Sequence, residues 1–158
     1  MPERLRAQHP QDLHITLAFL GDCTPAAALA AWALVEAEPP ARATLRLAKP
    51  AIFGSGRAIG FDLEGADALC AWMARYRARS PTAIDATSDN RAVRPHLTVA
   101  WTRHQRPVDE GLSGIPGLLS GSVGLPIPMA TVALCRRAEG NGRTAPRYRT
   151  LERLALHA

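Results

Sequence analysis

Two six-residue segments with the same pattern constrain the fold of this chain more than any other feature. The first runs from His14 to Phe19 and the second from His96 to Trp101. His, Thr and Ala are identical in the two segments, and the three remaining positions are apolar in both. This match indicates two similar strands in a single domain built from two related halves.

Side chains alternate between the two faces of a strand, so each segment has an apolar face and a polar face. In the first segment, Ile15, Leu17 and Phe19 are expected to point into the core. The residues between them, and their counterparts in the second segment, are expected to line the opposite face: His14, Thr16, Ala18, His96, Thr98 and Ala100. If a pseudo-twofold axis relates the two halves, the imidazoles face a common cleft.

Two opposed imidazoles suit general acid–base catalysis near neutral pH, because one accepts a proton while the other donates one. The hydroxyls of Thr16 and Thr98 are placed to donate hydrogen bonds to phosphoryl oxygens. The pattern therefore favours hydrolysis of a phosphodiester by water without a metal. A zinc site fits less well, because neither motif contains a carboxylate or a cysteine and two histidines fall short of the usual ligand set.

Each histidine also has a structural interpretation. A lone histidine on a strand is more often a hydrogen-bonded structural side chain than a catalyst, and it is the pairing of His14 with His96 that favours catalysis. The other histidines lie in polar or terminal contexts and are interpreted as surface residues: His9, His104 and His157. The stretch "GSGRAIG", residues 54–60, lacks the glycine spacing of a dinucleotide-binding loop and precedes a strand, so a hairpin turn is favoured.

Length and composition indicate a small globular protein. The 158 residues are expected to form one domain, residues 1–158, that needs no disulfide. No apolar run approaches the roughly 18 residues of a membrane span, and the N-terminus has no apolar signal-peptide core. Three widely spaced cysteines are typical of a reducing compartment. We expect a cytoplasmic monomer without a membrane partner.

The charge of the chain favours an anionic partner. Nineteen basic residues against 14 acidic ones give a net charge of +5, which does not choose among RNA, DNA, a nucleotide and an acidic protein. Arginines gather among glycine and proline residues in the last third of the chain: Arg136, Arg137, Arg143, Arg147, Arg149 and Arg153. They form either a solvated surface or a phosphate-binding rim, since charge clusters alone do not decide.

Periodicity and turn residues predict alternating strands and helices. Thr24 followed by Pro25 is typical of a helix start. The predicted helices cover residues 25–38 and 65–79, and the predicted strands cover residues 14–20, 43–48, 57–63, 95–102, 129–137 and 148–156. Residues 52–57 are predicted to form a turn, and residues 87–94 and 111–128 to form loops.

The paired motifs resemble those of the 2H phosphoesterase superfamily. "LHITLAFLGD" and "RPHLTVAW" are similar in particular to the bacterial and archaeal RNA 2′,3′-cyclic phosphodiesterases, also called 2′-5′ RNA ligases. The closing segment "GRTAPRYRTLERLAL" also resembles that family, so the likeness covers most of residues 12–156. It implies an α+β fold with two lobes related by a pseudo-twofold axis, two antiparallel sheets lining a central cleft, and helices outside.

The resemblance also implies an activity. It is metal-independent and cofactor-free hydrolysis of RNA or nucleotide 2′,3′-cyclic phosphate ends to 2′-phosphates, with ATP-independent 2′-5′ RNA ligation as a second reaction. The expected partners are RNA with cyclic phosphate ends or cyclic nucleotides. His96 would act as the base and His14 as the acid, and Thr16 and Thr98 would hold the phosphate.

Two departures from the family pattern stand out. Family members often carry Arg five residues after the second histidine, where this chain has Trp101. Arg103, two residues later on the same face, or the C-terminal arginines are the candidates to replace it. The family usually has a strand and a helix before the first motif, for which residues 1–13 are too few, since these need roughly 17 residues. A sheet edge is therefore expected to be open.

Other functions stay open at this point. A non-catalytic RNA-end-binding module would show salt-dependent binding without product. A 2H phosphodiesterase specific for 2′-5′ oligonucleotides would differ in its products, and a metal-dependent hydrolase would lose activity on chelation.

Overall fold

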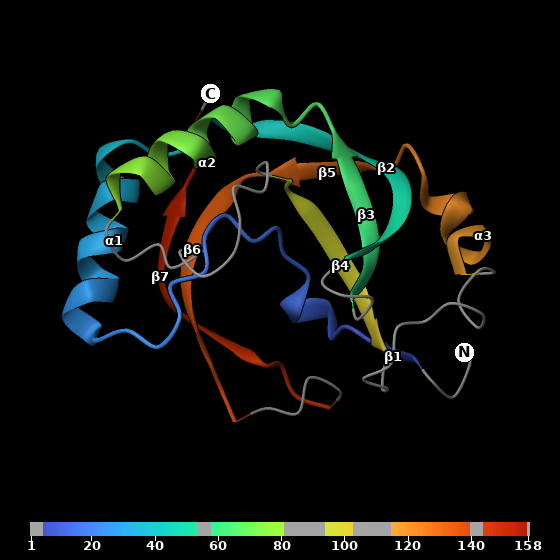
Figure 1. The fold of residues 1–158 in the computed structure, drawn as a ribbon, viewed down its shortest axis with the longest axis horizontal. Helices are drawn as coiled ribbons and strands as arrows, with labels where there is room; N and C mark the ends of the chain where they lie inside the picture. The colour runs from blue at the N-terminus through green and yellow to red at the C-terminus, as the bar shows by residue number, and fades with distance from the viewer. Residues whose placement is uncertain (1–4, 54–57, 81–93, 103–114, 140–143, 158) are drawn as a thin grey trace.

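The computed structural model describes residues 5–53, 58–80, 94–102, 115–139 and 144–157 (Figure 1). Within these ranges one antiparallel sheet has the strand order β1-β4-β3-β2-β5, and a second sheet pairs β6 with β7. The strands are β1 Leu5–Ala7, β2 Ala43–Phe53, β3 Ala58–Glu64, β4 His96–Thr102, β5 Pro126–Met129, β6 Thr131–Arg137 and β7 Tyr148–Ala155. The helices are α1 Pro25–Ala37, α2 Asp67–Arg79 and α3 Ile115–Leu119, with short 3₁₀ turns η1 Pro10–Asp12 and η2 Ser120–Ser122. The predicted α+β class with two antiparallel sheets is confirmed.

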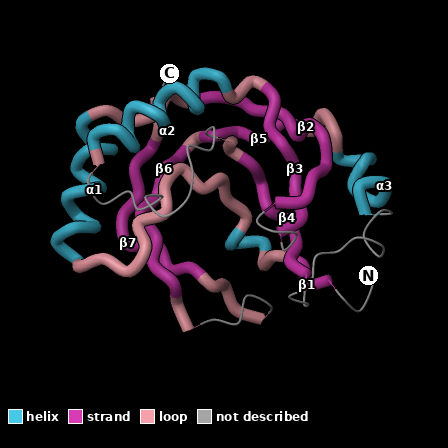
Figure 2. Tube along the Cα trace, in the orientation of Figure 1, coloured by secondary structure: helices cyan, strands magenta, loops and turns pink. Residues whose placement is uncertain are grey.

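The strands curl into an arch with α1 and α2 on its outer side (Figures 1 and 2). The largest core cluster lies between these helices and the strands, and it contains Trp32, Leu45, Trp72 and Met73. Leu45 and Met73 are almost completely buried there. The outer face of the arch is therefore the packed face, and the inner face is left for other roles.

Both predicted helices are confirmed. The hydroxyl of Thr24 accepts a hydrogen bond from the amide of Ala27, and Pro25 occupies the first turn of α1, where its missing N–H costs nothing. The buried residues of α2 are the four that have helical spacing in the sequence: Leu69, Trp72, Met73 and Tyr76. No helix in the described part of the chain is long and apolar enough to cross a membrane.

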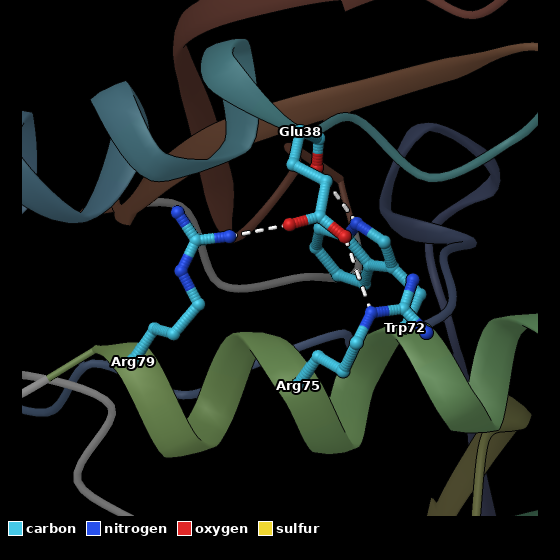
Figure 3. A network of polar contacts seen from close by, with 4 residues as sticks. All are labelled: Glu38, Trp72, Arg75 and Arg79. Atoms are coloured by element: carbon cyan, nitrogen blue, oxygen red, sulfur yellow. Dashed lines mark hydrogen bonds and ion pairs between the residues drawn. The ribbon is translucent and has the colours of Figure 1, made fainter.

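Glu38 joins the end of α1 to α2 (Figure 3). Its carboxylate accepts hydrogen bonds from Arg75 Nε, at 3.1 Å, and from the guanidinium of Arg79. Its carbonyl oxygen accepts a bond of 2.7 Å from the indole N–H of Trp72. The ion pairs are exposed and contribute at most about 1 kcal/mol each. The indole bond matters more, because it satisfies a polar group inside the core.

The predicted strand over residues 14–20 is wrong. Ile15 forms one isolated bridge with Leu97, and the chain then leaves the sheet. Leu17 and Ala18 are consecutive, yet both pack against the helix core, which the alternation of a strand does not permit. Phe19, expected in the core, is 65% exposed.

The predicted loop over residues 111–128 is wrong in part, because it contains α3, η2 and the first three residues of β5. Sequence analysis did not predict β5 because it contains Pro126 and Pro128, and proline disfavours strands. The structure accommodates both because β5 is the terminal strand beside β2. The predicted strand over residues 129–137 consequently begins at Thr131, since Met129 belongs to β5.

The structure adds the short strand β1, which sequence analysis missed because three residues are too few for an alternating pattern. It pairs antiparallel with β4 and is the terminal strand on that side, with η1 following it. The other predicted strands match β2, β3, β4, β6 and β7, and β2 extends to Phe53. Residues 54–57 of the predicted turn and most of the predicted polar loop, residues 87–93, lie outside the described ranges.

Candidate active site

The bridge between Ile15 and Leu97 brings the two motifs side by side in antiparallel directions. Each of these residues directly follows the histidine of its motif. Extending the antiparallel register of this isolated bridge by one residue on each side sets His14 against Thr98 and Thr16 against His96. An antiparallel bridge has an approximate local twofold axis, and about this axis the His and Thr residues next to Ile15 correspond to those next to Leu97. Residues directly opposite one another have Cβ atoms about 5 Å apart and diagonal pairs about 7–8 Å apart, which sets the scale of the site.

The four predicted side chains share one face of the sheet. Bridge partners point to the same side, and Ile15 and Leu97 both pack into the core, where Leu97 is 8% exposed. The residues directly before and after each bridged residue point the other way, because alternation holds next to the bridge even though the first motif does not continue as a strand. They are His14, Thr16, His96 and Thr98, and all four are exposed or half-buried.

Both imidazoles are held in the same way. His14 Nδ1 lies 2.6 Å from the carbonyl oxygen of Asp12, and His96 Nδ1 lies 3.0 Å from the carbonyl oxygen of Arg94. Each carbonyl belongs to the residue two positions earlier. A carbonyl only accepts, so Nδ1 is the donor in both rings, and Nε2 is the nitrogen that is not bonded to the backbone.

The Nε2 atom of His14 lies 3.1 Å from the hydroxyl oxygen of Thr16. When the ring is neutral, this nitrogen accepts a hydrogen bond from the hydroxyl. When the ring is charged, it donates one instead, and the hydroxyl proton is then available to another acceptor. The pair can therefore respond to a change of charge at one histidine.

Each imidazole also contacts an aromatic ring from a distant part of the chain. Tyr148, the first residue of β7, meets His14 edge to face at 5.2 Å between ring centroids. Phe53, the last residue of β2, stacks on His96 at 4.1 Å. The sequence analysis assigned neither residue to the site: Tyr148 lies in the closing segment that resembles the family, but both contacts depend on tertiary packing. Together with the Nδ1 bonds, they fix the orientation of the two rings.

A β-bulge in β4 changes which residues face the site. Ile59 of β3 pairs with Ala100, whereas the next residue, Gly60, pairs with Thr98, so Val99 is an extra residue. Ala100 is consequently turned into the core and is 4% exposed. The prediction that Ala100 lines the site face is wrong for this reason.

The prediction for Ala18 fails as well, because this residue packs against the helix core.

Gly60 allows the bulged strand to come close to β3. A Cβ atom at this position would lie 1.9 Å from the carbonyl oxygen of Leu97 and 2.9 Å from the Cα atom of Thr98. Both atoms are backbone, so no rotation of a side chain relieves the overlap. The position of the second motif therefore depends on the absence of a side chain at residue 60.

Asp12 is a buried residue of the site that sequence analysis missed. It is 2% exposed, and its carboxylate accepts hydrogen bonds from the amides of Arg147, at 2.7 Å, and Tyr148, at 3.3 Å. Its carbonyl oxygen accepts hydrogen bonds from His14 Nδ1 and, at 3.2 Å, from the side-chain amide of Gln8. Asp12 thus connects the first motif with the start of β7.

Arg94 and Asp62 form a bidentate pair beside His96, with both N–O distances at 2.7 Å. The Arg94 guanidinium also lies 5.0 Å from the Phe53 ring. The hydrogen bonds to Asp62 raise the pKa of Arg94 above its usual value. Because a carboxylate offsets its charge, Arg94 is a weak candidate for binding an anionic substrate.

The remaining predicted residues fall outside this face or outside the described ranges. Arg103, Arg143 and His104 are among the residues that the structure does not describe. His9 caps η1, with its Nδ1 atom accepting from the amide of Gln11, and His157 is exposed. Among the described residues, no group of three or more His, Cys, Asp or Glu side chains is arranged to hold a metal ion.

Solved structures share this architecture. A crystal structure of a phosphoesterase matches with a TM-score of 0.70 and 24% identity, over 100% of this chain and 84% of its own. E. coli LigT complexed with ATP matches with a TM-score of 0.64 and 24% identity, over 99% of this chain and 83% of its own. The chain has the LigT-like 2H phosphoesterase fold. A third match is TT0787 of Thermus thermophilus, with a TM-score of 0.69 and 22% identity over 98% of this chain and 84% of its own.

No protein-family model matches the sequence, and a search of curated proteins finds no relative. The fold implied by the resemblance of the paired motifs is confirmed by the match to these solved structures. Because the identities to the LigT-like structures lie below 25%, they establish the fold alone. The chemistry has to be argued from the residues of this chain.

Proposed function

We propose that this chain hydrolyses RNA or nucleotide 2′,3′-cyclic phosphate ends to 2′-phosphates, using His14 and His96 as a metal-independent acid–base pair. The observation that carries the proposal is the twofold arrangement about the Ile15–Leu97 bridge. Such an arrangement would offer one phosphate two imidazoles and two hydroxyls from the same face. In each ring Nδ1 donates its hydrogen bond to a backbone carbonyl, so Nε2 is the nitrogen proposed to exchange a proton with the substrate.

The proposed step is an in-line displacement at phosphorus. His96 Nε2 takes a proton from water while the water oxygen forms a bond to phosphorus. The bond between phosphorus and O3′ breaks, and His14 Nε2 gives its proton to O3′. The phosphate remains on O2′. This assignment of base and acid follows the family resemblance, and microscopic reversibility exchanges the two roles in the reverse reaction.

The two threonines have a defined part in this step. Negative charge builds up on the non-bridging phosphoryl oxygens as the water attacks. Thr16 and Thr98 offer hydroxyl donors next to the histidines, and each lies opposite the histidine of the other motif in the bridge register. A donor on each side of the phosphate would stabilise this charge without a metal ion.

The ligand class has independent support. E. coli LigT has been crystallised with ATP and with 3′-AMP, which are nucleotides with phosphate groups. The net charge of +5 on this chain also favours an anionic ligand. We extend the proposal to RNA ends on this basis, and to ATP-independent 2′-5′ ligation as the reverse-type reaction at the same site.

The test uses 2′,3′-cyclic AMP as substrate and identifies the product by phosphorus NMR. We expect 2′-AMP, activity unchanged by EDTA, and a loss of about 10²- to 10⁴-fold in kcat for His14→Ala and for His96→Ala. His157→Ala, which alters an exposed histidine, is the matched control. Full activity in the double variant His14→Ala/His96→Ala would refute the proposal.

The alternatives give different results in the same assay. RNA 3′ ends that bind with a steep salt dependence but yield no product would indicate a non-catalytic module. Trp101, which stands where the family often carries arginine, is the residue that favours this alternative. Cleavage of 2′-5′ oligonucleotides in preference to the cyclic nucleotide would indicate the other substrate class.

A further inference from the structure

We infer that Arg147 supplies the positive charge that binds the substrate phosphate at this site, and that Trp101 holds its guanidinium in place. This inference rests on the proposed function, because it assigns a residue to the same phosphate. Arg147 precedes β7 and lies far from both motifs in the sequence. Three observations support this role of Arg147. They are the face of the sheet on which Trp101 lies, the contacts of Arg147, and the interactions that already occupy the other arginines near the site.

Trp101 faces the same side of the sheet as the second motif. On β3, Ala58, Gly60 and Asp62 are two positions apart and therefore share a face. Their partners on β4 share it too, and these are Trp101, Thr98 and His96 respectively. The extra residue in the bulge is what brings an odd-spaced side chain, five positions after the histidine, onto the site face.

The pairing of β4 with β1, on its other edge, also places Trp101 on the site face. Trp101 pairs with Arg6 of β1, and the neighbouring pairs are Leu5 with Thr102 and Ala7 with Ala100. Leu5 and Ala100 are both buried in one core cluster. Trp101 and Arg6 therefore point away from that core. Two independent strand pairings thus place the indole on the face that carries His96 and Thr98.

The Arg147 guanidinium lies 5.8 Å from the centre of the Trp101 ring, within the range of a cation–π contact. The indole is itself fixed, because its N–H donates a bond of 2.7 Å to the side-chain oxygen of Gln8. The backbone of Arg147 is fixed by the bond from its amide to the buried Asp12 carboxylate. The residue is thus held at both its backbone and its charged end.

The position of Arg147 also ties it to the first motif. The next residue, Tyr148, packs its ring against His14. Arg147 therefore contacts a side chain of the second motif while its neighbour in sequence contacts the histidine of the first. An arginine placed between two halves of a phosphate site is a suitable anion ligand, because its planar guanidinium makes paired, charge-assisted bonds to phosphate oxygens.

Other arginines near the site are less suited. Arg94 is paired with Asp62 in a bidentate ion pair. Arg6 already takes part in another interaction. Among the described residues, the ion pairs of the structure leave Arg147 without a carboxylate at its guanidinium. An aromatic face holds a cation without neutralising it, so the charge of Arg147 remains for a ligand.

The test compares Arg147→Ala and Arg147→Lys with Arg153→Ala, which removes the same charge from an exposed position of β7. Two quantities are measured for each variant: kcat and KM for 2′,3′-cyclic AMP, and the affinity for 2′-AMP by calorimetry at two salt concentrations. Arg147→Ala is expected to weaken 2′-AMP binding and to lower kcat/KM by about 10- to 100-fold, the range for a lost hydrogen bond to a charged group. Arg147→Lys keeps the charge but loses the paired geometry, so part of the activity returns.

A second variant, Trp101→Leu, separates the positioning role of Trp101 from the phosphate-binding role of Arg147. It is expected to weaken 2′-AMP binding in the wild-type background and to have little further effect once Arg147 is alanine. Thermal unfolding of every variant confirms that the comparison is made on folded protein.

Equal effects of Arg147→Ala and Arg153→Ala on binding and on kcat/KM would overturn the inference while leaving the proposed function intact. A wild-type protein that binds 2′-AMP through Arg147 but does not turn over the cyclic nucleotide would instead refute the proposed function alone. The binding measurement therefore distinguishes the two failures.

Discussion

Replacing Gly60 by alanine is expected to displace the strand that carries His96 and Thr98. The added Cβ atom would lie 1.9 Å from the Leu97 carbonyl oxygen, whereas close contacts between carbon and oxygen are about 3.3 Å or longer. The two strands must therefore separate by more than about 1 Å. The obstructing atoms are backbone atoms of β4 itself, so the displacement moves the second motif and its β-bulge together.

The size of the effect follows from this overlap. Overpacking of this kind costs about 1–3 kcal/mol of folding free energy. For a chain of this size that lowers Tm by about 2–12 °C. A displacement of about 1 Å at a catalytic group costs on the order of 10²-fold in rate. We therefore expect Gly60→Ala to remain folded at room temperature and to lose far more activity than stability.

The assay is thermal unfolding followed by circular dichroism, together with kcat/KM for 2′,3′-cyclic AMP. Gly117→Ala is the matched control, because a Cβ atom there meets nothing within 4 Å. It should leave kcat/KM close to the wild-type value and should not lower Tm, because alanine is favoured over glycine within a helix. A Gly60→Ala protein with unchanged Tm and unchanged kcat/KM would refute the reasoning that close strand approach positions the second motif.

Three further substitutions have expected outcomes. Asp12→Asn leaves one of the two amides at the start of β7 facing an NH₂ group. We therefore expect the free energy of unfolding, measured by denaturant titration, to fall by about 1–3 kcal/mol and kcat/KM to fall as well. Unchanged stability would contradict the role of Asp12 in connecting the first motif with β7. Thr24→Ala removes the cap of α1 and should cost about 1 kcal/mol in the same titration, whereas Thr24→Ser should restore it. Arg94→Ala loses a largely exposed ion pair but keeps the carbonyl that orients His96, so kcat/KM should fall by less than about tenfold; a loss as large as that of His96→Ala would show that its side chain acts in catalysis.

The two helices and the strand that carries the second motif were predictable, because the patterns that indicate them are local in the sequence. Thr24 and Pro25 mark a helix start wherever they occur before a helical segment, and the alternation within β4 identifies Leu97 as buried. The fold class followed from the resemblance of the two motifs to one known family. These features depend on the residues next to them in sequence.

The remaining features depend on residues that are far apart. The bulge at Val99 arises from the pairing of β4 with β3, and without knowledge of that pairing Ala100 was assigned to the wrong face. The single bridge at Ile15 replaces a full strand because the following residues pack on the helices. The contacts of Asp12 with the start of β7 carry no local signal at all.

The central claim is that the two imidazoles face one phosphate. It is tested most directly by NMR titration of the protein with 2′-AMP, following the ring C–H resonances of its five histidines. We predict that the signals of His14 and His96 shift together along one binding curve, while those of His9 and His157 stay in place. A ligand that binds tightly but shifts only one of the two, or neither, would contradict the account.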